Sequence, residues 1–498
     1  MANDFRRFDP RSTAPARRLA EQALSRTAGA PLVTGNHVRL LKDARENYPA
    51  WLEAIAGARR CIFFENYIID NDDTGQRFAA ALAERACAGV RVRVIYDWVG
   101  GLGLGSRQVL EPVTAAGGEV RVFNAPSPLS PFGWMQRDHR KMMAVDGRIG
   151  FVSGLCVSSR WNGDVANGMA PWRDTGIAIT GPAVADIERA FAQVWAATGA
   201  PLAEDAFNPA ASMARTGDVP LRVLANLPNY ANLYRLDQLI ATMATRTLWL
   251  TDAYYVGIAP YVQALRAAAR DGVDVRLLVP GVSDVMAVTT LSRSGYRTLL
   301  EAGIRVFEWN GSMLHAKTAV ADGRWARVGS TNLNIASWIG NYELDVAIED
   351  AGFAAQMEAA YEEDLCNATE IVLSARNRVR PAMERRRDRT RAHRRFRGSA
   401  SRAAAGALRI GNTVGAAITN HRVLGPAEAG IMALVALALL GLVTIALLWP
   451  LAVALPLSLL GAWIALSLLA RAYVLRRQGA AEPEPVTREP DAAKPDSE

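Results

Sequence analysis

The sequence has few cysteines, and its N-terminus offers no sign of export. Four cysteines, Cys61, Cys87, Cys156 and Cys366, are scattered over 498 residues without a C-x-x-C pair. This spacing indicates neither a disulfide scaffold nor a zinc site, and it favours a reducing compartment. The first residues, Met-Ala-Asn-Asp-Phe-Arg-Arg, lack the apolar core of a signal peptide. We therefore expect the folded body to stay on the side of the membrane where it is made.

Basic charge is concentrated in one segment. The formal net charge is +7, but residues 376–402 hold twelve arginines against Glu384 and Asp388, so the rest of the chain is net −3. A mildly acidic body argues against a broad surface that follows nucleic-acid phosphates. The arginine run is either a solvated linker or a segment attracted to an anionic leaflet, where each basic residue contributes about 1 kcal/mol. We favour the second interpretation.

A long uncharged stretch follows the arginine run. Residues 429–470 contain no ionisable group. At about 1.5 Å per residue, one helix of this length would be about twice the hydrocarbon thickness of a bilayer, which favours two spans. Trp449-Pro450 through Pro456 supplies the expected break, and a buried hairpin of a soluble domain is the alternative. Because both flanks are basic, the positive-inside bias places both ends of the stretch, and with them the folded body, on the cytoplasmic side of the membrane.

The chain contains an internal repeat. Cys61–Trp98 and Thr247–Pro280 share the order strand, helix and buried strand, and Ala115–Phe123 is echoed by Leu300–Trp309. Alternating short strands and helices predict two α/β units. We therefore divide the chain into a flexible arm (1–33), a first half (34–200), a linker (201–218), a second half (219–375), an Arg-rich juxtamembrane segment (376–428), the transmembrane hairpin (429–471) and a disordered tail (472–498).

Each half carries one copy of the pattern H-x-K-x-x-x-x-D. The first copy runs from His139 through Lys141 to Asp146, and the second from His315 through Lys317 to Asp322. Two of the five histidines and two of the four lysines in the chain lie in these copies. In a strand, residues two apart point to the same face, so an imidazole and an ammonium would converge. Lysine is a compact point charge that suits a phosphate oxygen.

A further carboxylate follows each motif. Asp174 lies in the segment PWRDT and Glu343 in NYELD. Either could accept the second imidazole N–H, which would fix the tautomer and raise the basicity of the reacting nitrogen. The alternative is an ordinary acid at the start of the next strand.

The paired motif resembles that of the phospholipase D superfamily. Gly329-Ser330-Thr331-Asn332 is similar to the family's G-S-x-N, whereas the first copy has Cys156 where Asn is usual. The segments RDHRKMMAVDGRIGFVSG and PWRDT are closer to bacterial cardiolipin synthases. The resemblance implies two pseudo-symmetric α/β/α halves with one active site at their interface. It also implies that Lys141, Lys317, Ser330 and Asn332 hold the phosphate.

The resemblance further implies a phosphatidyltransferase that works through a phosphohistidine, most simply a cardiolipin synthase. One histidine would attack phosphorus and the other would protonate the leaving alcohol, which requires neither a metal nor another cofactor. The expected partners are an anionic phospholipid, with phosphatidylglycerol favoured, and the membrane; we expect no nucleic acid and no obligatory protein partner. The alternatives are hydrolysis to phosphatidic acid, a phosphodiesterase acting on nucleic acid, and a scaffold with a dead site. The apolar loop Pro128–Met135 would either dip toward the bilayer or pack as a lid.

Overall fold

The computed structural model describes residues 14–126, 136–164, 168–207, 214–373 and 379–382, and residues 436–479 apart from 438, 439 and 445. The loop Pro128–Met135, most of the arginine run and the tail from residue 480 lie outside the described residues. The two repeats belong to one compact unit, and the C-terminal residues from Leu434 belong to another. Helix α1 (Ala14–Ala28) precedes the first repeat, and its Leu24 and Ala28 are buried.

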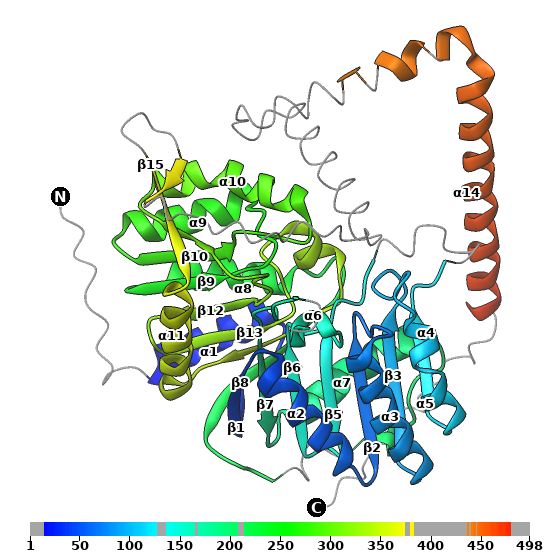
Figure 1. Ribbon diagram of the computed structural model, residues 1–498, viewed down its shortest axis with the longest axis horizontal. Helices are drawn as coiled ribbons and strands as arrows, with labels where there is room; N and C mark the ends of the chain where they lie inside the picture. Colours follow the sequence, from blue (N-terminus) through cyan, green and yellow to red (C-terminus); the bar gives the residue numbers. More distant parts are fainter. Residues whose placement is uncertain are drawn as a thin grey trace, which may run out of the picture. The chain divides into compact units, whose positions relative to one another are not determined.

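The two repeats have the same strand order (Figure 1). The first half contributes β1 (Val33–Lys42), β2 (Cys61–Asn66), β3 (Arg91–Asp97), β4 (Glu119–Phe123), β5 (Lys141–Val145), β6 (Ile149–Ser153) and β7 (Thr175–Thr180). The second half contributes β8 (Val219–Asn226), β9 (Thr247–Thr251), β10 (Asp274–Pro280), β11 (Arg305–Trp309), β12 (Thr318–Ala321), β13 (Trp325–Gly329), β14 (Glu343–Ile348), β15 (Ala368–Leu373) and β16 (Val379–Pro381). From the centre outward, the order β1-β7-β6-β5-β2-β3-β4 is matched by β8-β14-β13-β12-β9-β10-β11. An antiparallel β1–β8 contact joins the halves.

The helices form layers on the sheet. The longer helices are α2 (Asp43–Ala56), α3 (Asp73–Cys87) and α7 (Val184–Ala197) in the first half, and α8 (Asn232–Met243), α9 (Ala259–Arg270), α10 (Met286–Leu300) and α11 (Ala351–Leu365) in the second. Short helices α4 (Ser106–Val109), α5 (Glu111–Ala115) and α6 (Ser159–Asn162) occupy connections of the first half. Helices α2 and α3 pack in an outer core of the first half, and α8 and α9 in an outer core of the second.

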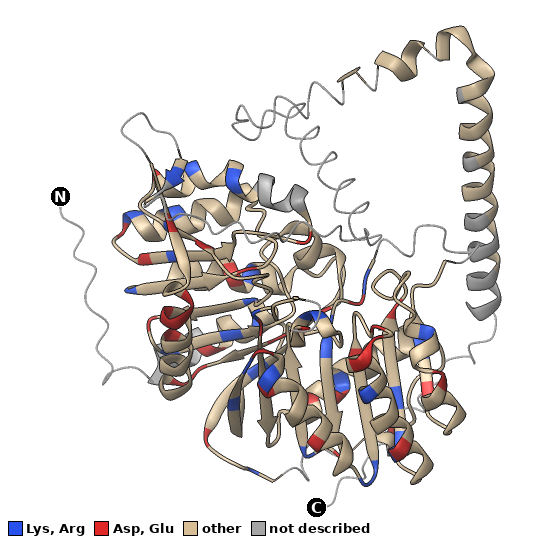
Figure 2. Cartoon of the chain, viewed as in Figure 1, with Lys and Arg blue, Asp and Glu red and all other residues tan. Residues whose placement is uncertain are grey.

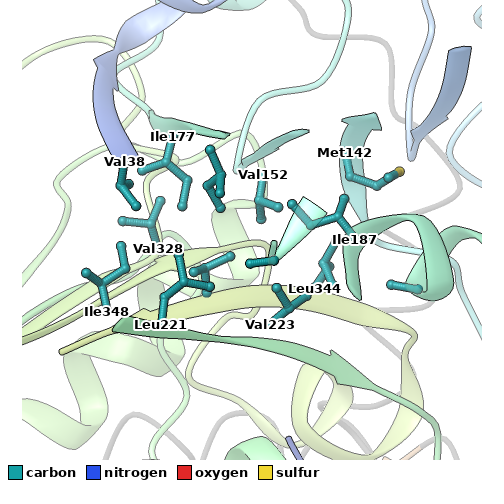
Figure 3. Close-up of a cluster of buried hydrophobic side chains, with 14 of the residues drawn as sticks. Val38, Met142, Val152, Ile177, Ile187, Leu221, Val223, Val328, Leu344 and Ile348 are labelled. Carbon is teal, nitrogen blue, oxygen red and sulfur yellow. The ribbon is translucent and has the colours of Figure 1, made fainter. Parts of the chain in front are cut away.

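A third core is shared by both halves. It combines α7 and α11 with strand residues of each repeat, and Figure 3 shows Val152 and Ile177 of the first half facing Val328 and Leu344 of the second. Each of these four side chains is almost completely buried. At about 25 cal/mol per Å² of apolar area removed from water, a shared core of this kind fixes the halves to one another. The α/β/α arrangement thus makes one rigid frame from two repeats.

The C-terminal unit contains helix α14 (Pro450–Gly479). This helix runs through Pro456, within the segment where the sequence predicted a break between two spans. Among the described helices, none combines the length and apolar character needed to cross a bilayer. The expected transmembrane hairpin over 429–471 is therefore not confirmed.

Candidate active site

Both motifs lie where strands begin. Lys141 is the first residue of β5 and lies opposite Asn66, the last residue of β2. In the second half, Lys317 immediately precedes β12, which pairs with β9 in the same antiparallel manner. Because β2 and β3 are parallel and β5 runs against them, the start of β5 shares a sheet edge with the carboxyl ends of β2 and β3. The two motifs therefore occupy equivalent positions in their halves.

Each histidine is paired with a carboxylate from the other half. His139 Nδ1 lies 2.9 Å from Glu343 Oε2, and His315 Nδ1 lies 2.7 Å from Asp174 Oδ2. All four side chains are buried. The sequence predicted that these carboxylates accept an imidazole N–H, but it did not reveal that the pairing crosses between the repeats.

Short backbone contacts between the halves produce this crossing. His139 N donates to Tyr342 O (2.9 Å), and His315 N donates to Arg173 O (2.7 Å). In both cases the acceptor immediately precedes the partner carboxylate in the sequence. The backbone hydrogen bond therefore places each histidine next to the residue that follows its acceptor, and the imidazole lies beside the carboxylate of that residue. Neither half holds a complete histidine–carboxylate pair by itself.

The two carboxylates have different supports. Glu343 accepts hydrogen bonds from Ser330 Oγ (2.5 Å) and Asn341 Nδ2 (3.1 Å). Asp174 Oδ2 accepts one from Trp161 Nε1 (2.8 Å), so the indole and His315 share one oxygen. At Gly154 an added Cβ would lie 2.2 Å from Asp174 Oδ1, so glycine leaves the space that this carboxylate fills.

The two lysines lie against their histidines. Lys141 Nζ donates to His139 O (2.5 Å), and Lys317 Nζ donates to His315 O and lies 2.9 Å from both ring nitrogens of His315. Both lysine side chains are buried. The ammonium of each motif also influences the histidine of the other motif electrostatically. The two imidazoles and two ammonium groups therefore share one electrostatic environment.

Both histidines are neutral in the resting site. Burial lowers the pKa of His139 to about 4, against the opposing effect of Glu343. Burial and the Lys317 ammonium lower the pKa of His315 to about 3, against the effect of Asp174. Burial also lowers the pKa of Lys317 to about 8. Burial alone would raise the pKa values of Asp174 and Glu343, but their histidine partners hold them below the usual values. A neutral imidazole beside a carboxylate is suited to act as a nucleophile or base.

The motif aspartates lie elsewhere. Asp146 accepts hydrogen bonds from the backbone N–H groups of Arg59, Arg60 and Cys61 at 2.8–2.9 Å. Asp322 accepts equivalent bonds from the backbone of residues 245–247. Both follow the far ends of β5 and β12, seven residues or about 24 Å along the chain from the histidines at about 3.4 Å per residue. The expectation that they join the catalytic group is not met; they anchor the starts of β2 and β9.

Ser330 and Asn332, the remaining predicted residues, differ in what they contact. Ser330, expected to hold phosphate, instead donates to Glu343 and accepts from Leu344 N. Asn332 is buried, and its Oδ1 has no hydrogen-bond partner among the described residues. Cys156 is also buried. Burial raises the pKa of its thiol, and the two site lysines oppose this shift only in part. Asn332 thus retains a free polar atom, whereas its counterpart in the first half offers only a thiol.

Aromatic residues that the sequence analysis missed surround the histidines. The rings of Trp161, Trp172 and Tyr254 lie 5.1–5.8 Å from the ring of His315, and that of Tyr67 lies 4.9 Å from His139. Trp172 could have been found from the sequence because it lies in the segment PWRDT with Asp174, whereas no sequence pattern pointed to Trp161. These rings remove water from around the imidazoles. Within the described residues, no group of three or more His, Cys, Asp or Glu is arranged to hold a metal ion.

Comparison with known proteins gives consistent matches. A family described as "Cardiolipin synthase, PLD-like domain" matches residues 238–365. Cardiolipin synthase A of Pseudomonas aeruginosa is 34% identical over 367 residues, which cover 72% of this chain and 73% of that protein. Cardiolipin synthase of Geobacillus thermodenitrificans is 32% identical over 349 residues and 68% of each chain. Phosphatidylserine synthase of Haemophilus influenzae has a similar fold, with a TM-score of 0.57, 15% identity and coverage of 71% of this chain and 92% of that one.

Proposed function

The chain belongs to the cardiolipin synthase family of phospholipase D-like enzymes, and we propose that it transfers a phosphatidyl group between two phosphatidylglycerol molecules, releasing cardiolipin and glycerol. The observation that carries the proposal is the crossed pairing of each histidine with a carboxylate of the other half, 2.7–2.9 Å away. Two oriented imidazoles and two ammonium groups provide a nucleophile, an acid and countercharge for one phosphodiester. The two relatives named above, which are 34% and 32% identical to the chain over 72% and 68% of its length, are cardiolipin synthases.

The first chemical step forms a phosphorus–nitrogen bond. Because Nδ1 of each histidine lies against a carboxylate, Nε2 is the nitrogen left for phosphorus. At His315 the Lys317 ammonium, 2.9 Å from Nε2, must turn toward the phosphate before Nε2 can react. Nε2 of one histidine attacks, the phosphorus–oxygen bond to the head-group glycerol breaks, and the second histidine supplies the proton that glycerol takes away. Both histidines are neutral at rest, so the second one must gain its proton as the anionic substrate binds. The negative phosphate beside it favours that protonation.

The second step restores the enzyme. A hydroxyl of the incoming phosphatidylglycerol gives its proton to the second histidine, and its oxygen displaces the phosphohistidine nitrogen. Lys141 and Lys317 neutralise the charge that grows on the non-bridging oxygens in both steps, in a site from which water is largely removed. The carboxylates stabilise each imidazolium as it forms.

We further propose that the enzyme works at the cytoplasmic face of a bacterial membrane. Twelve arginines in residues 376–402 and the uncharged residues 429–470 support membrane association. The charges of the body also favour a lipid over a nucleic-acid substrate. In Figure 2, basic and acidic residues are interspersed along the ribbon of the described body.

Incubation with phosphatidylglycerol vesicles tests the proposal. Cardiolipin and glycerol are the expected products by mass spectrometry, and the variants His139→Ala and His315→Ala should both lose turnover while remaining folded. Phosphatidic acid as the sole product would replace the transferase with a hydrolase. Cleavage of single-stranded DNA without action on lipid would replace both with a nuclease. Substantial activity in either variant would contradict the paired site.

A further inference from the structure

We infer that Asn66 supplies the first half-site with the phosphate-contacting carboxamide that Cys156 lacks. The inference rests on the proposed phosphodiester chemistry and assigns a residue outside the paired motif. In the second half, Asn332 follows β13 and presents an unpartnered carboxamide oxygen. The equivalent position after β6 is Cys156, whose thiol is a weak hydrogen-bond donor. The first half would thus lack this contact unless another element provided it.

Register places Asn66 in the site. It is directly opposite Lys141 in the antiparallel β2–β5 pair. Residues directly opposite one another in such a pair project from the same face, with Cβ atoms about 4.5–5.5 Å apart. The carboxamide of Asn66 therefore lies on the face that carries the Lys141 ammonium. Its Nδ2 also reaches the segment that bears Cys156, through a long 3.5 Å contact with Leu155 O.

The hydrogen bonding of Asn66 is incomplete. The side chain is fully buried, yet its Oδ1 has no partner among the described residues and its Nδ2 has only the 3.5 Å contact. Buried amides are normally well paired, because leaving one unpaired costs about 1–3 kcal/mol. Asn36 illustrates the normal case: its Nδ2 donates to Val33 O and Val219 O, and its Oδ1 accepts from Ala183 N. An unpartnered Oδ1 also occurs at the buried Asn47 and Asn226, but the Nδ2 groups of those residues make hydrogen bonds of 2.9–3.2 Å. What distinguishes Asn66 is its Nδ2, which carries two N–H donors and has only the one long contact, so a donor is available for a ligand oxygen.

The corresponding position in the second half has a different role. Asp252 follows β9 where Asn66 ends β2, and its carboxylate accepts from Leu333 N (2.8 Å) and Tyr254 N (3.1 Å). The carboxylate of Asp252 is thus already hydrogen-bonded to backbone N–H groups, and in the second half-site Asn332 supplies the carboxamide. Each half-site then holds one carboxamide, on β2 in the first half and after β13 in the second. When a phosphodiester binds, Asn66 Nδ2 gives up its long contact and donates to a non-bridging oxygen.

Substitutions at Asn66 test this role with a small chiral diester. The substrate is methyl p-nitrophenyl phosphorothioate, resolved into its two enantiomers, and the enzyme is the full chain. Asn66→Leu and Asn66→Asp both remove the donor, and the latter keeps the size of the side chain. The rate is measured on the corresponding oxygen diester, methyl p-nitrophenyl phosphate. On that substrate we expect kcat to fall about 100-fold with little change in KM, as for loss of one transition-state donor. The preference between the enantiomers should shrink in both variants, because one contact to a particular non-bridging position is lost.

Two controls complete the test. Asn36→Asp perturbs a paired buried amide outside the site, so it should lower the melting temperature while leaving the enantiomer preference at its wild-type value. Cys156→Asn in the Asn66→Leu background should recover at least tenfold of the lost kcat. Wild-type kcat in Asn66→Leu, or a slower enzyme with the wild-type enantiomer preference, would overturn the inference. Because this diester is not a lipid, failure to make cardiolipin would count against the proposed function without affecting this result.

Discussion

The crossed pairing predicts that Asp174→Asn disables the histidine of the other half. Asp174 Oδ2 lies 2.7 Å from His315 Nδ1 in a buried site. A neighbouring opposite charge of this kind shifts a pKa by about 1–3 units, and each unit corresponds to about 1.4 kcal/mol. Removal of the charge therefore costs the developing imidazolium about 1.4–4 kcal/mol, or about 10- to 1000-fold in rate. An amide that also forces the wrong tautomer extends the expected loss in kcat to about 10⁴-fold, the value known for a serine-protease triad.

Imidazole titration by NMR shows which histidine responds. The chain has five histidines, so their signals can be assigned by single substitutions. In Asp174→Asn the pKa of His315 should be lower than in the wild type, because the Asp174 charge that raises it is gone, while the pKa of His139 should be unchanged. Glu343→Gln is the matched variant and should lower the pKa of His139 alone. If Asp174→Asn instead shifted only His139, the pairing would be within one half and the crossing would be refuted.

Three further outcomes follow from the site. The pKa values of His139 and His315 lie below the unfolded value of about 6.5, so the unfolded state binds more protons and these groups lower the stability as pH falls from about 6.5 to 4. Urea unfolding in this window should have a smaller pH slope in the variant with both histidines replaced by Ala, and an equal slope would contradict the assignment. Asp146→Asn should lower the unfolding free energy by about 1–3 kcal/mol while kcat per folded molecule stays within about twofold; a large loss of kcat would return this residue to the catalytic group. Trp161→Phe keeps the ring but not the N–H that reaches Asp174, so kcat should fall about tenfold with KM unchanged and the pH profile displaced; an unchanged profile would reduce Trp161 to a packing residue.

The repeat could be predicted from the sequence because local hydrophobic patterns determine its strands and helices. Cys61–Trp98 and Thr247–Pro280 share the same alternation of buried strand and helix, and these segments form the corresponding strands β2–β3 and β9–β10. Hydrophobic periodicity reports local structure of this kind directly. Periodicity indicated the α/β class, and the paired motif added the resemblance to the phospholipase D superfamily; the comparisons confirm both.

The crossing of the site was not predictable from local pattern. It depends on bonds such as His139 N to Tyr342 O, between residues about 200 positions apart, and no periodicity encodes such a contact. The motif spacing also misplaced Asp146, because five strand residues separate it from the site edge. Trp161 was missed for a similar reason, since an isolated tryptophan outside any motif is more often a core residue.

The stereochemical course at phosphorus tests the central claim most directly. If one imidazole forms a covalent intermediate and an alcohol then displaces it, phosphorus undergoes two in-line displacements. The measurement uses phosphatidylglycerol made chiral at phosphorus with sulfur and heavy oxygen, and compares the configuration of the cardiolipin analogue with that of the substrate. Retention of configuration is the result that two histidines acting on one phosphorus predict. Inversion would mean a single direct displacement and would contradict the account.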